Sequence, residues 1–168
     1  IAGPANVNLS AEGTSDWVHL GLTAASDVNR KATGGSRISE SANSTLAQYN
    51  AYATTFSWSD GAPTASANNT PNGVYVLGSG KGFTITAPAD STIRTLRVYV
   101  NVGGTAALTA HLSDASAADY ADTQTNTNNG ATWLYTLRYA ASSTAQTLSV
   151  SWQLSSGTGV SFIAATLQ

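Results

Sequence analysis

The chain has 168 residues and a formal net charge of -2, and it contains neither cysteine nor methionine. A charge this small provides no basic field for nucleic acid or for an anionic membrane surface, so we expect neither as a partner. The lack of cysteine excludes disulfides, thiolate nucleophiles and zinc sites built on sulfur.

The length predicts one domain, residues 1–168, built around a single core. No apolar run is long enough for a membrane helix, and the first residues, IAGPANVNLS, lack the charged and apolar regions of a signal peptide. Small residues and amides are abundant, and an initiator methionine is missing. We therefore expect a mature module excised from a larger secreted, extracellular protein.

Alternation of apolar and polar residues with period two recurs along the chain, whereas sustained helical periodicity is absent. The pattern predicts an all-β fold. The expected strands of the first half are NVNLS (6–10), DWVHLGL (16–22), SRISESA (36–42), YATTFSWSDG (52–61), GVYVLGSG (73–80) and GFTITAP (82–88). Those of the second half are STIRTLRVYVNVGG (91–104), TAALTAHLSD (105–114), ATWLYTLRYAA (131–141), AQTLSVSWQL (145–154) and VSFIAATLQ (160–168).

So many short strands exceed one small sheet and predict two antiparallel sheets packed as a β-sandwich. Gly103 and Gly104 predict a tight hairpin after the strand 91–104, and SSGTG predicts a turn between the last two strands. Trp152 alternates with valine and leucine and is expected in the core. Trp133 and the alternate residues after it, through Tyr139, are interpreted as a core face rather than as an exposed platform.

One stretch, DWVHLGLTAASDVNRK (16–31), gathers acidic, basic and histidine side chains in a chain that has few charges. If the aliphatic residues between them point inward, Trp17 and His19 point outward. Sugar-binding sites combine flat aromatic rings with hydrogen-bonding side chains. The stretch therefore predicts one wall of a shallow ligand site, with Trp17 and His19 facing a sugar ring and with Asn29, Arg30 and Lys31 as donors.

The turn that carries Trp58 and Asp60 is the expected opposite wall of this site. Two alternatives stay open for these residues. Trp17 and the Phe56 and Trp58 face could belong to the core, and Arg30 could lie in a solvated loop paired with a neighbouring aspartate.

The segment SDASAADYADT places Asp114, Asp119 and Asp122 in one connection. Calcium takes oxygen ligands from such clusters and can hold a loop of a β-sandwich in place. The spacing lacks the alternating acids of a helical calcium loop. A structural calcium at these three aspartates is the one cofactor prediction.

Catalysis is the weaker hypothesis, and we expect no enzyme. Hydrolysis of a glycoside generally needs two facing carboxylates, and only two glutamates are present, Glu12 and Glu40. Neither His19 nor His111 accompanies a GxSxG nucleophile motif. A small lyase or hydrolase would need a cleft that joins Glu40 or Asp16 to a base such as Arg30.

The segments DWVHLGL and VNRKA, with ISESA, FSWSDGAPTAS, GFTITAPADSTIRTLRVYV and LTAHLSD, resemble a carbohydrate-binding-like β-sandwich accessory module of secreted multidomain bacterial glycoside hydrolases. The resemblance implies a jelly-roll or galactose-binding-like topology and a non-catalytic carbohydrate-binding module that targets an appended catalytic domain to a polysaccharide. Relatives often carry an aromatic residue where this chain has Leu20.

The weak basic character of the chain favours a neutral plant or microbial glycan as the ligand of such a module. The alternative is a structural spacer or cell-surface interaction module without glycan affinity. In that case the serine, threonine and asparagine content reflects solubility and strand propensity alone.

Overall fold

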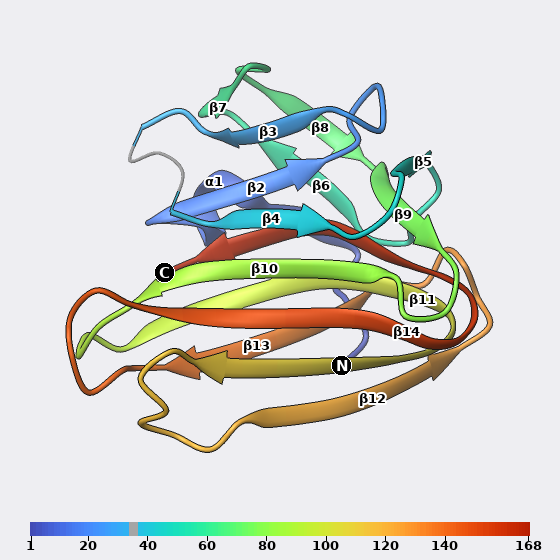
Figure 1. The fold of residues 1–168 in the computed structure, drawn as a ribbon. Helices are drawn as coiled ribbons and strands as arrows, with labels where there is room; N and C mark the ends of the chain where they lie inside the picture. The colour runs from blue at the N-terminus through green and yellow to red at the C-terminus, as the bar shows by residue number, and fades with distance from the viewer. Residues whose placement is uncertain (34–36) are drawn as a thin grey trace.

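The centre of the fold is a pair of long antiparallel strands, β11 (Arg94–Leu112) and β14 (Gln146–Leu167). In the computed structural model, which describes residues 1–33 and 37–168, the two strands pair from Leu96 opposite Leu167 to Leu112 opposite Leu148. Alternating valine and leucine residues give both strands strong β propensity. Of the nine other strands described in the main sheet, five pair directly with one of these two, and the remaining four attach through a neighbouring strand (Figure 1).

Both long strands bend over at their middle, where the register shifts at Gly103 and Gly104. Gly104 has φ of 136° and Gly157 has φ of 115°, which are values that residues with a side chain seldom adopt. A Cβ on Gly104 would lie 2.2 Å from the carbonyl oxygen of Ser156, so the two backbones meet closely at the bend. One hydrogen-bonded sheet therefore folds over on itself into two layers.

The bend divides the strands into two sheets. The first sheet holds residues 104–112 of β11, residues 146–156 of β14, β12 (Tyr120–Asn126), β10 (Gly82–Ala89) and β4 (Ser39–Ala42). The second sheet holds residues 94–103 of β11, residues 159–167 of β14, β13 (Trp133–Tyr139), β2 (Asp16–Leu20), β3 (Val28–Lys31), β7 (Gly61–Ala62), β9 (Gly73–Leu77) and β5 (Ala47–Tyr49).

The main core fills the space between these two sheets. Aromatic contacts cross it: the ring centroids of Phe83 and Phe162 are 5.9 Å apart, as are those of Tyr135 and Trp152. Trp152 is fully buried and Tyr139 is largely buried, so the core prediction for these side chains is confirmed. Trp133 is only partly buried at the margin of the same core.

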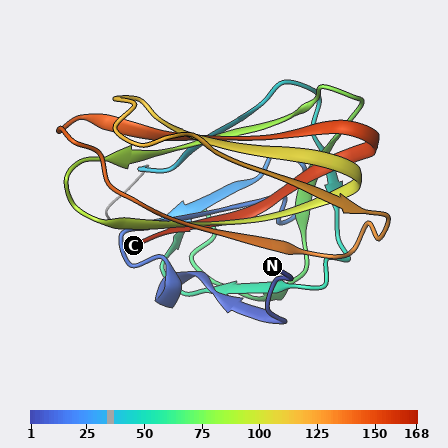
Figure 2. The same cartoon turned by 90° about the horizontal axis from the view of Figure 1, so that it is seen from below.

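A further layer, here called the outer layer, covers part of the other face of the second sheet (Figure 2). It consists of β1 (Asn6–Asn8), α1 (Leu9–Glu12), β6 (Thr55–Trp58) and β8 (Ala67–Thr70). The side chain of Asn8 caps α1 by accepting from the amide of Ala11. Under this layer lies a second apolar cluster, which includes Tyr99 and Ile163.

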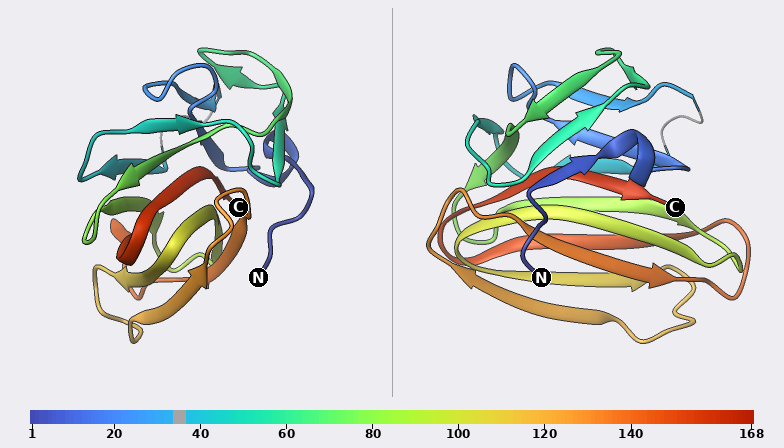
Figure 3. Two further views of the ribbon diagram at one scale, coloured as in Figure 1. Left: turned by 90° about the vertical axis from the view of Figure 1, so that its right-hand side faces the viewer. Right: turned by 180° about the vertical axis from the view of Figure 1, so that it is seen from behind.

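The all-β sandwich predicted from the sequence is confirmed, but several details of the strand prediction are wrong. Leu9 and Ser10 of the expected strand 6–10 lie in α1, and β3, β5, β8 and β12 lie outside the expected strands. No hairpin forms at Gly103 and Gly104, because β11 continues through the bend. The two expected final strands are one strand, β14, for the same reason (Figure 3). Of the predicted strand 36–42, Ser36 lies outside the described residues, and the strand itself begins at Ser39. The described residues contain no helix with the length and apolarity to cross a membrane.

The bend predicts a large cost for a side chain at Gly104. Gly104→Ala would combine an unfavourable φ with a clash against the facing backbone, whereas Gly80→Ala shares the positive φ but meets nothing within 4 Å. We expect Gly80→Ala to lower the free energy of unfolding by about 1 kcal/mol. Gly104→Ala should lower it by at least about 2 kcal/mol more, because of the overpacking. Urea denaturation followed by tryptophan fluorescence measures both, and equal losses would contradict the role given to the bend.

Candidate functional site

The aromatic residues of the predicted ligand wall are buried. Trp17 and His19 of β2 are 0% exposed, and Trp58 of β6 is 3% exposed. The ring centroids of Trp17 and Trp58 are 5.3 Å apart, and those of His19 and Trp58 are 5.0 Å apart. The alternation along β2 was interpreted correctly, but its outward face meets the outer layer instead of solvent. The prediction that Trp17, His19 and Trp58 face a sugar is therefore wrong.

Asp60 joins this aromatic cluster to the charged residues. Its carboxylate accepts from Nε1 of Trp17 at 2.9 Å, from Nζ of Lys31 at 2.5 Å and from the hydroxyl of Ser10. Burial alone would raise the pKa of Asp60, but hydrogen bonds from Lys31, Ser10 and Trp17 outweigh it and hold the pKa below its usual value. Asp60 and Lys31 thus connect α1, β2, β3 and the turn after β6.

Arg30 and Asn29 of β3 are occupied in the same way. Arg30 donates to both carboxylate oxygens of Glu40 at 2.6 Å and to the carbonyl oxygen of Ile38. The buried amide of Asn29 accepts from the backbone of Thr64 at 3.0 Å. Burial raises the pKa of Glu40 although Arg30 opposes it. The 16–31 stretch is therefore a structural polar network at the edge of the second sheet: Asn29 is only 1% exposed, and the guanidinium of Arg30 is paired with Glu40.

The calcium prediction at Asp114, Asp119 and Asp122 is wrong as well. Within the described residues, no group of three His, Cys, Asp or Glu side chains is arranged to hold a metal ion. The aspartates have separate partners: Asp114 accepts from the amide of Ser142, Asp119 pairs with His111, and Asp122 accepts from the hydroxyl of Tyr135. Asp114 and Asp119 lie in the connection after β11, whereas Asp122 lies on β12.

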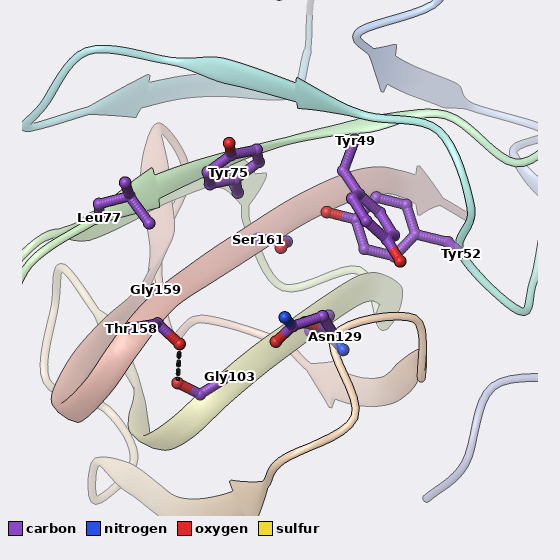
Figure 4. Close-up of a pocket in the computed structure, with 10 residues that line it drawn as sticks. Tyr49, Tyr52, Tyr75, Leu77, Gly103, Asn129, Thr158, Gly159 and Ser161 are labelled. Atoms are coloured by element: carbon purple, nitrogen blue, oxygen red, sulfur yellow. Dashed lines mark hydrogen bonds between the residues drawn. The ribbon is translucent and has the colours of Figure 1, made fainter.

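A pocket that the sequence did not indicate lies on the other face of the second sheet, beside the bend (Figure 4). It encloses about 320 Å³. This tyrosine pocket is lined by Tyr49, Tyr52, Tyr75, Leu77, Asn101, Gly103, Asn129, Thr158, Gly159 and Ser161. None of these lining residues has a charged side chain.

Strand register produces the floor of the pocket. Asn101, Ser161 and Tyr75 form one row across β11, β14 and β9, since Ser161 pairs with each of the other two. In the next row, Gly103 lies opposite Gly159 on β14, which in turn lies opposite the exposed Leu77. The absence of side chains at the two glycines hollows the sheet between taller neighbours.

Two tyrosine rings form one end of the pocket. The centroids of Tyr49 and Tyr52 are 4.7 Å apart in an edge-to-face arrangement, and the ring of Tyr75 lies further along the same wall (Figure 4). Tyr52 is buried, and its burial raises the pKa of its phenol well above the usual value, with the hydroxyl of Ser161 acting in the opposite direction. The phenols of Tyr49 and Tyr75 are partly exposed.

The polar groups of the pocket divide into those that hold the site together and those that are free. Nδ2 of Asn101 donates to the carbonyl oxygens of Asn128 and Ala131, and so holds the loop between β12 and β13 against β11. Among the described residues, no group donates to Oδ1 of Asn101, and no side-chain hydrogen bond joins Asn129 to the protein. Asn101 is 2% exposed and Asn129 is exposed, so water or a ligand can satisfy these two groups.

The lack of a side chain at Gly103 leaves the space that the side chain of Asn129 occupies. A Cβ at Gly103 would lie 2.5 Å from Oδ1 of Asn129 and 2.8 Å from Oγ1 of Thr158. Thr158 also donates to the carbonyl oxygen of Gly103 at 2.9 Å. The glycine thus allows an amide and a hydroxyl to converge over the strand.

Sequence reasoning missed this pocket because its residues come from five separate segments of the chain. The one available signal was the alternation of Tyr75 with the buried Val74 and Val76, which places its ring on the outer face of β9. That face is open at Tyr75 and covered at Trp17, and the coverage depends on where the outer layer ends.

No protein-family model matches the chain, and no curated protein is similar to it at a significant level. Among solved structures, the chain is similar to TmCBM61 in complex with β-1,4-galactotriose, with 13% identity, TM-score 0.47 and coverage of 79% of this chain and 88% of that chain. It is also similar to Xyl-CBM35 in complex with a disaccharide containing glucuronic acid, with 12% identity, TM-score 0.48 and coverage of 82% and 90%.

A third similar structure is the CBM22-1 xylan-binding domain of Paenibacillus barcinonensis Xyn10C, with 12% identity, TM-score 0.47 and coverage of 90% and 91%. All three are carbohydrate-binding modules with a β-sandwich fold.

The buried His19 predicts a loss of stability in mild acid. Burial lowers its pKa to about 4 from 6.5, with the backbone of Asn72 opposing weakly. Because the unfolded chain takes up the proton first, the stability due to neutral His19 is complete above pH 6.5 and is lost as the pH falls toward 4. The loss should reach about 3 kcal/mol.

Urea denaturation of the native protein between pH 7 and pH 4.5 measures this slope. His19→Leu keeps an apolar contact with Phe56 and Trp58 and should flatten it, whereas the exposed His111→Ala should leave it unchanged. A slope that survives in His19→Leu would contradict the assignment.

Proposed function

We propose that this chain is a non-catalytic carbohydrate-binding module whose tyrosine pocket binds a neutral sugar. The observation that carries the proposal is the composition of the pocket: three tyrosines, two asparagine amides and two hydroxyls, with no charged side chain. A sugar ring presents an apolar face of C–H groups and a rim of hydroxyls. Phenol rings and amides match these two features.

Tyr75 and Tyr49 offer the partly exposed rings for the apolar face of the sugar. Asn101 and Asn129 provide amide groups that can pair with sugar hydroxyls, and Ser161 provides a hydroxyl of its own. The floor of the pocket is already formed before a ligand binds, because Asn101 and Gly103 belong to a central strand of the sheet. An anionic sugar would find no cationic partner among the lining residues.

The surroundings of the pocket support binding rather than catalysis. Glycoside hydrolysis generally uses two facing carboxylates, and none of the lining residues is acidic. The two glutamates have structural partners elsewhere. Glu12 accepts from the hydroxyls of Tyr99 and Thr166, and Glu40 accepts from Arg30.

As part of the same proposal, the module belongs to a larger secreted protein and holds an appended catalytic domain against its polysaccharide. The composition without cysteine, methionine or many charges supports an extracellular setting. A shallow, hydrated site gives modest affinity, which suits a module that must release and rebind along a substrate surface.

Removal of a pocket ring tests this function. Native affinity electrophoresis against β-1,4-galactan, xylan, β-glucan and mannan should retard the native protein in at least one gel. Tyr75→Ala should then weaken binding about tenfold or more, because an aromatic anchor in a pocket contributes over 1 kcal/mol. Tyr120→Ala removes an exposed tyrosine on β12, outside the pocket, and should bind like the native protein.

Two results would contradict the proposal. If no glycan retards the native protein, the alternative of a spacer or surface module without glycan affinity is favoured. If Tyr120→Ala weakens binding and Tyr75→Ala does not, the ligand binds elsewhere.

A further inference from the structure

The tyrosine pocket has one closed end and one open end, and this shape limits what can enter it. At the closed end, the amide of Ala53 donates to the carbonyl oxygen of Gly130 at 2.7 Å. This bond joins the segment after β5 directly to the loop between β12 and β13. Ala53 directly follows Tyr52, so this bond holds the segment that carries both tyrosines against the loop at this end of the pocket.

Side chains complete the same end wall. The hydroxyl of Tyr49 lies 3.7 Å from the position that a Cβ on Gly130 would occupy, so the ring reaches across to the loop. Behind it, Thr54 donates through its amide to the hydroxyl of Thr132 and through its own hydroxyl to the carbonyl oxygen of Pro4. Three chain segments therefore block any continuation of the pocket in this direction.

The opposite end is open. It is formed by Leu77, which is 57% exposed, together with the exposed Thr158 and the two glycines of the floor. Figure 4 shows Leu77 and Thr158 on the far side of the pocket from Tyr49 and Tyr52. A ligand chain can leave the pocket past these residues.

The volume of the tyrosine pocket is suited to a short segment of glycan. A cavity of about 320 Å³ is at the lower limit of small-molecule sites, which generally span about 300–1,000 Å³. A polysaccharide that crosses a site along its length needs a groove open at both ends, and this pocket is open at one.

We infer that the tyrosine pocket takes the terminal residues of a neutral glycan chain, with the chain leaving past Leu77 and Thr158, and that it does not bind internal stretches. This inference rests on the proposed function, because it specifies which part of the glycan the same pocket receives. The wall of Tyr49 and the loop at Gly130 is the specificity-determining feature.

Depletion binding of the native protein to a polysaccharide before and after limited endo-cleavage tests the inference. Insoluble xylan and β-1,4-galactan serve as probes at equal mass, with chain ends counted by a reducing-sugar assay. For terminal binding, the capacity per unit mass rises by the same factor as the number of chain ends. For internal binding, it stays constant or falls.

A variant at the end wall and a variant outside the pocket provide the matched comparison. Tyr120→Ala lies outside the pocket and should keep the native ratio of capacities, whereas Tyr49→Ala opens the wall and should move that ratio toward one. A constant capacity in the native protein overturns terminal recognition while leaving the carbohydrate-binding function intact. No binding to cleaved or intact polysaccharide overturns both.

Discussion

The bend shared by β11 and β14 is the constraint on which the rest of this structure depends. Backbone hydrogen bonds between two strands remain continuous through a fold only if both strands bend together. Gly104 and Gly157 permit this by adopting positive φ at facing positions, where their backbones approach too closely for a side chain. All the other strands of the main sheet then attach to one half or the other, and the sandwich and its core result.

The same bend creates the candidate site. Side chains normally cover the surface of a sheet. Gly103 and Gly159, next to the bend, have none and leave a hollow. The outer layer covers the part of this face above Trp17 and Tyr99 and ends before Tyr75 is reached. Pocket and buried cluster are thus two parts of one sheet face, one left open and one covered. The glycines of the bend thus account both for the close approach of the two backbones and for the hollow of the pocket.

The charged residues of the 16–31 stretch serve this arrangement from the covered part. Asp60 and Lys31 tie α1 and the turn after β6 to β3, and Arg30 with Glu40 ties β3 to β4. Partly buried ion pairs of this kind add little net stability, but they determine which segments of the chain pack together. Asp60 and Lys31 attach the outer layer to the second sheet, and Arg30 with Glu40 joins the second sheet to the first.

Local alternation determined much of the fold. Because side chains alternate strictly along a strand, the inward valines of β11 and β14 and the buried Trp152 could be predicted from sequence spacing alone. The two-layer sandwich followed from the number of strands. The glycine pairs were recognised as special positions but assigned to turns, since a bulge within a long strand and a tight hairpin use the same residue.

The function-bearing surface could not be determined in this way. Alternation predicts that the side chains of Trp17 and Tyr75 both lie on the outer face of the second sheet. It does not predict which part of that face is covered by another layer. That depends on long-range packing of the segments around β1, β6 and β8, which are distant from β9 in the hydrogen-bond order of the structure. The sequence by itself therefore determined the strand composition and the main core, whereas only the tertiary structure decided that Trp17 is core and that Tyr75 faces a pocket.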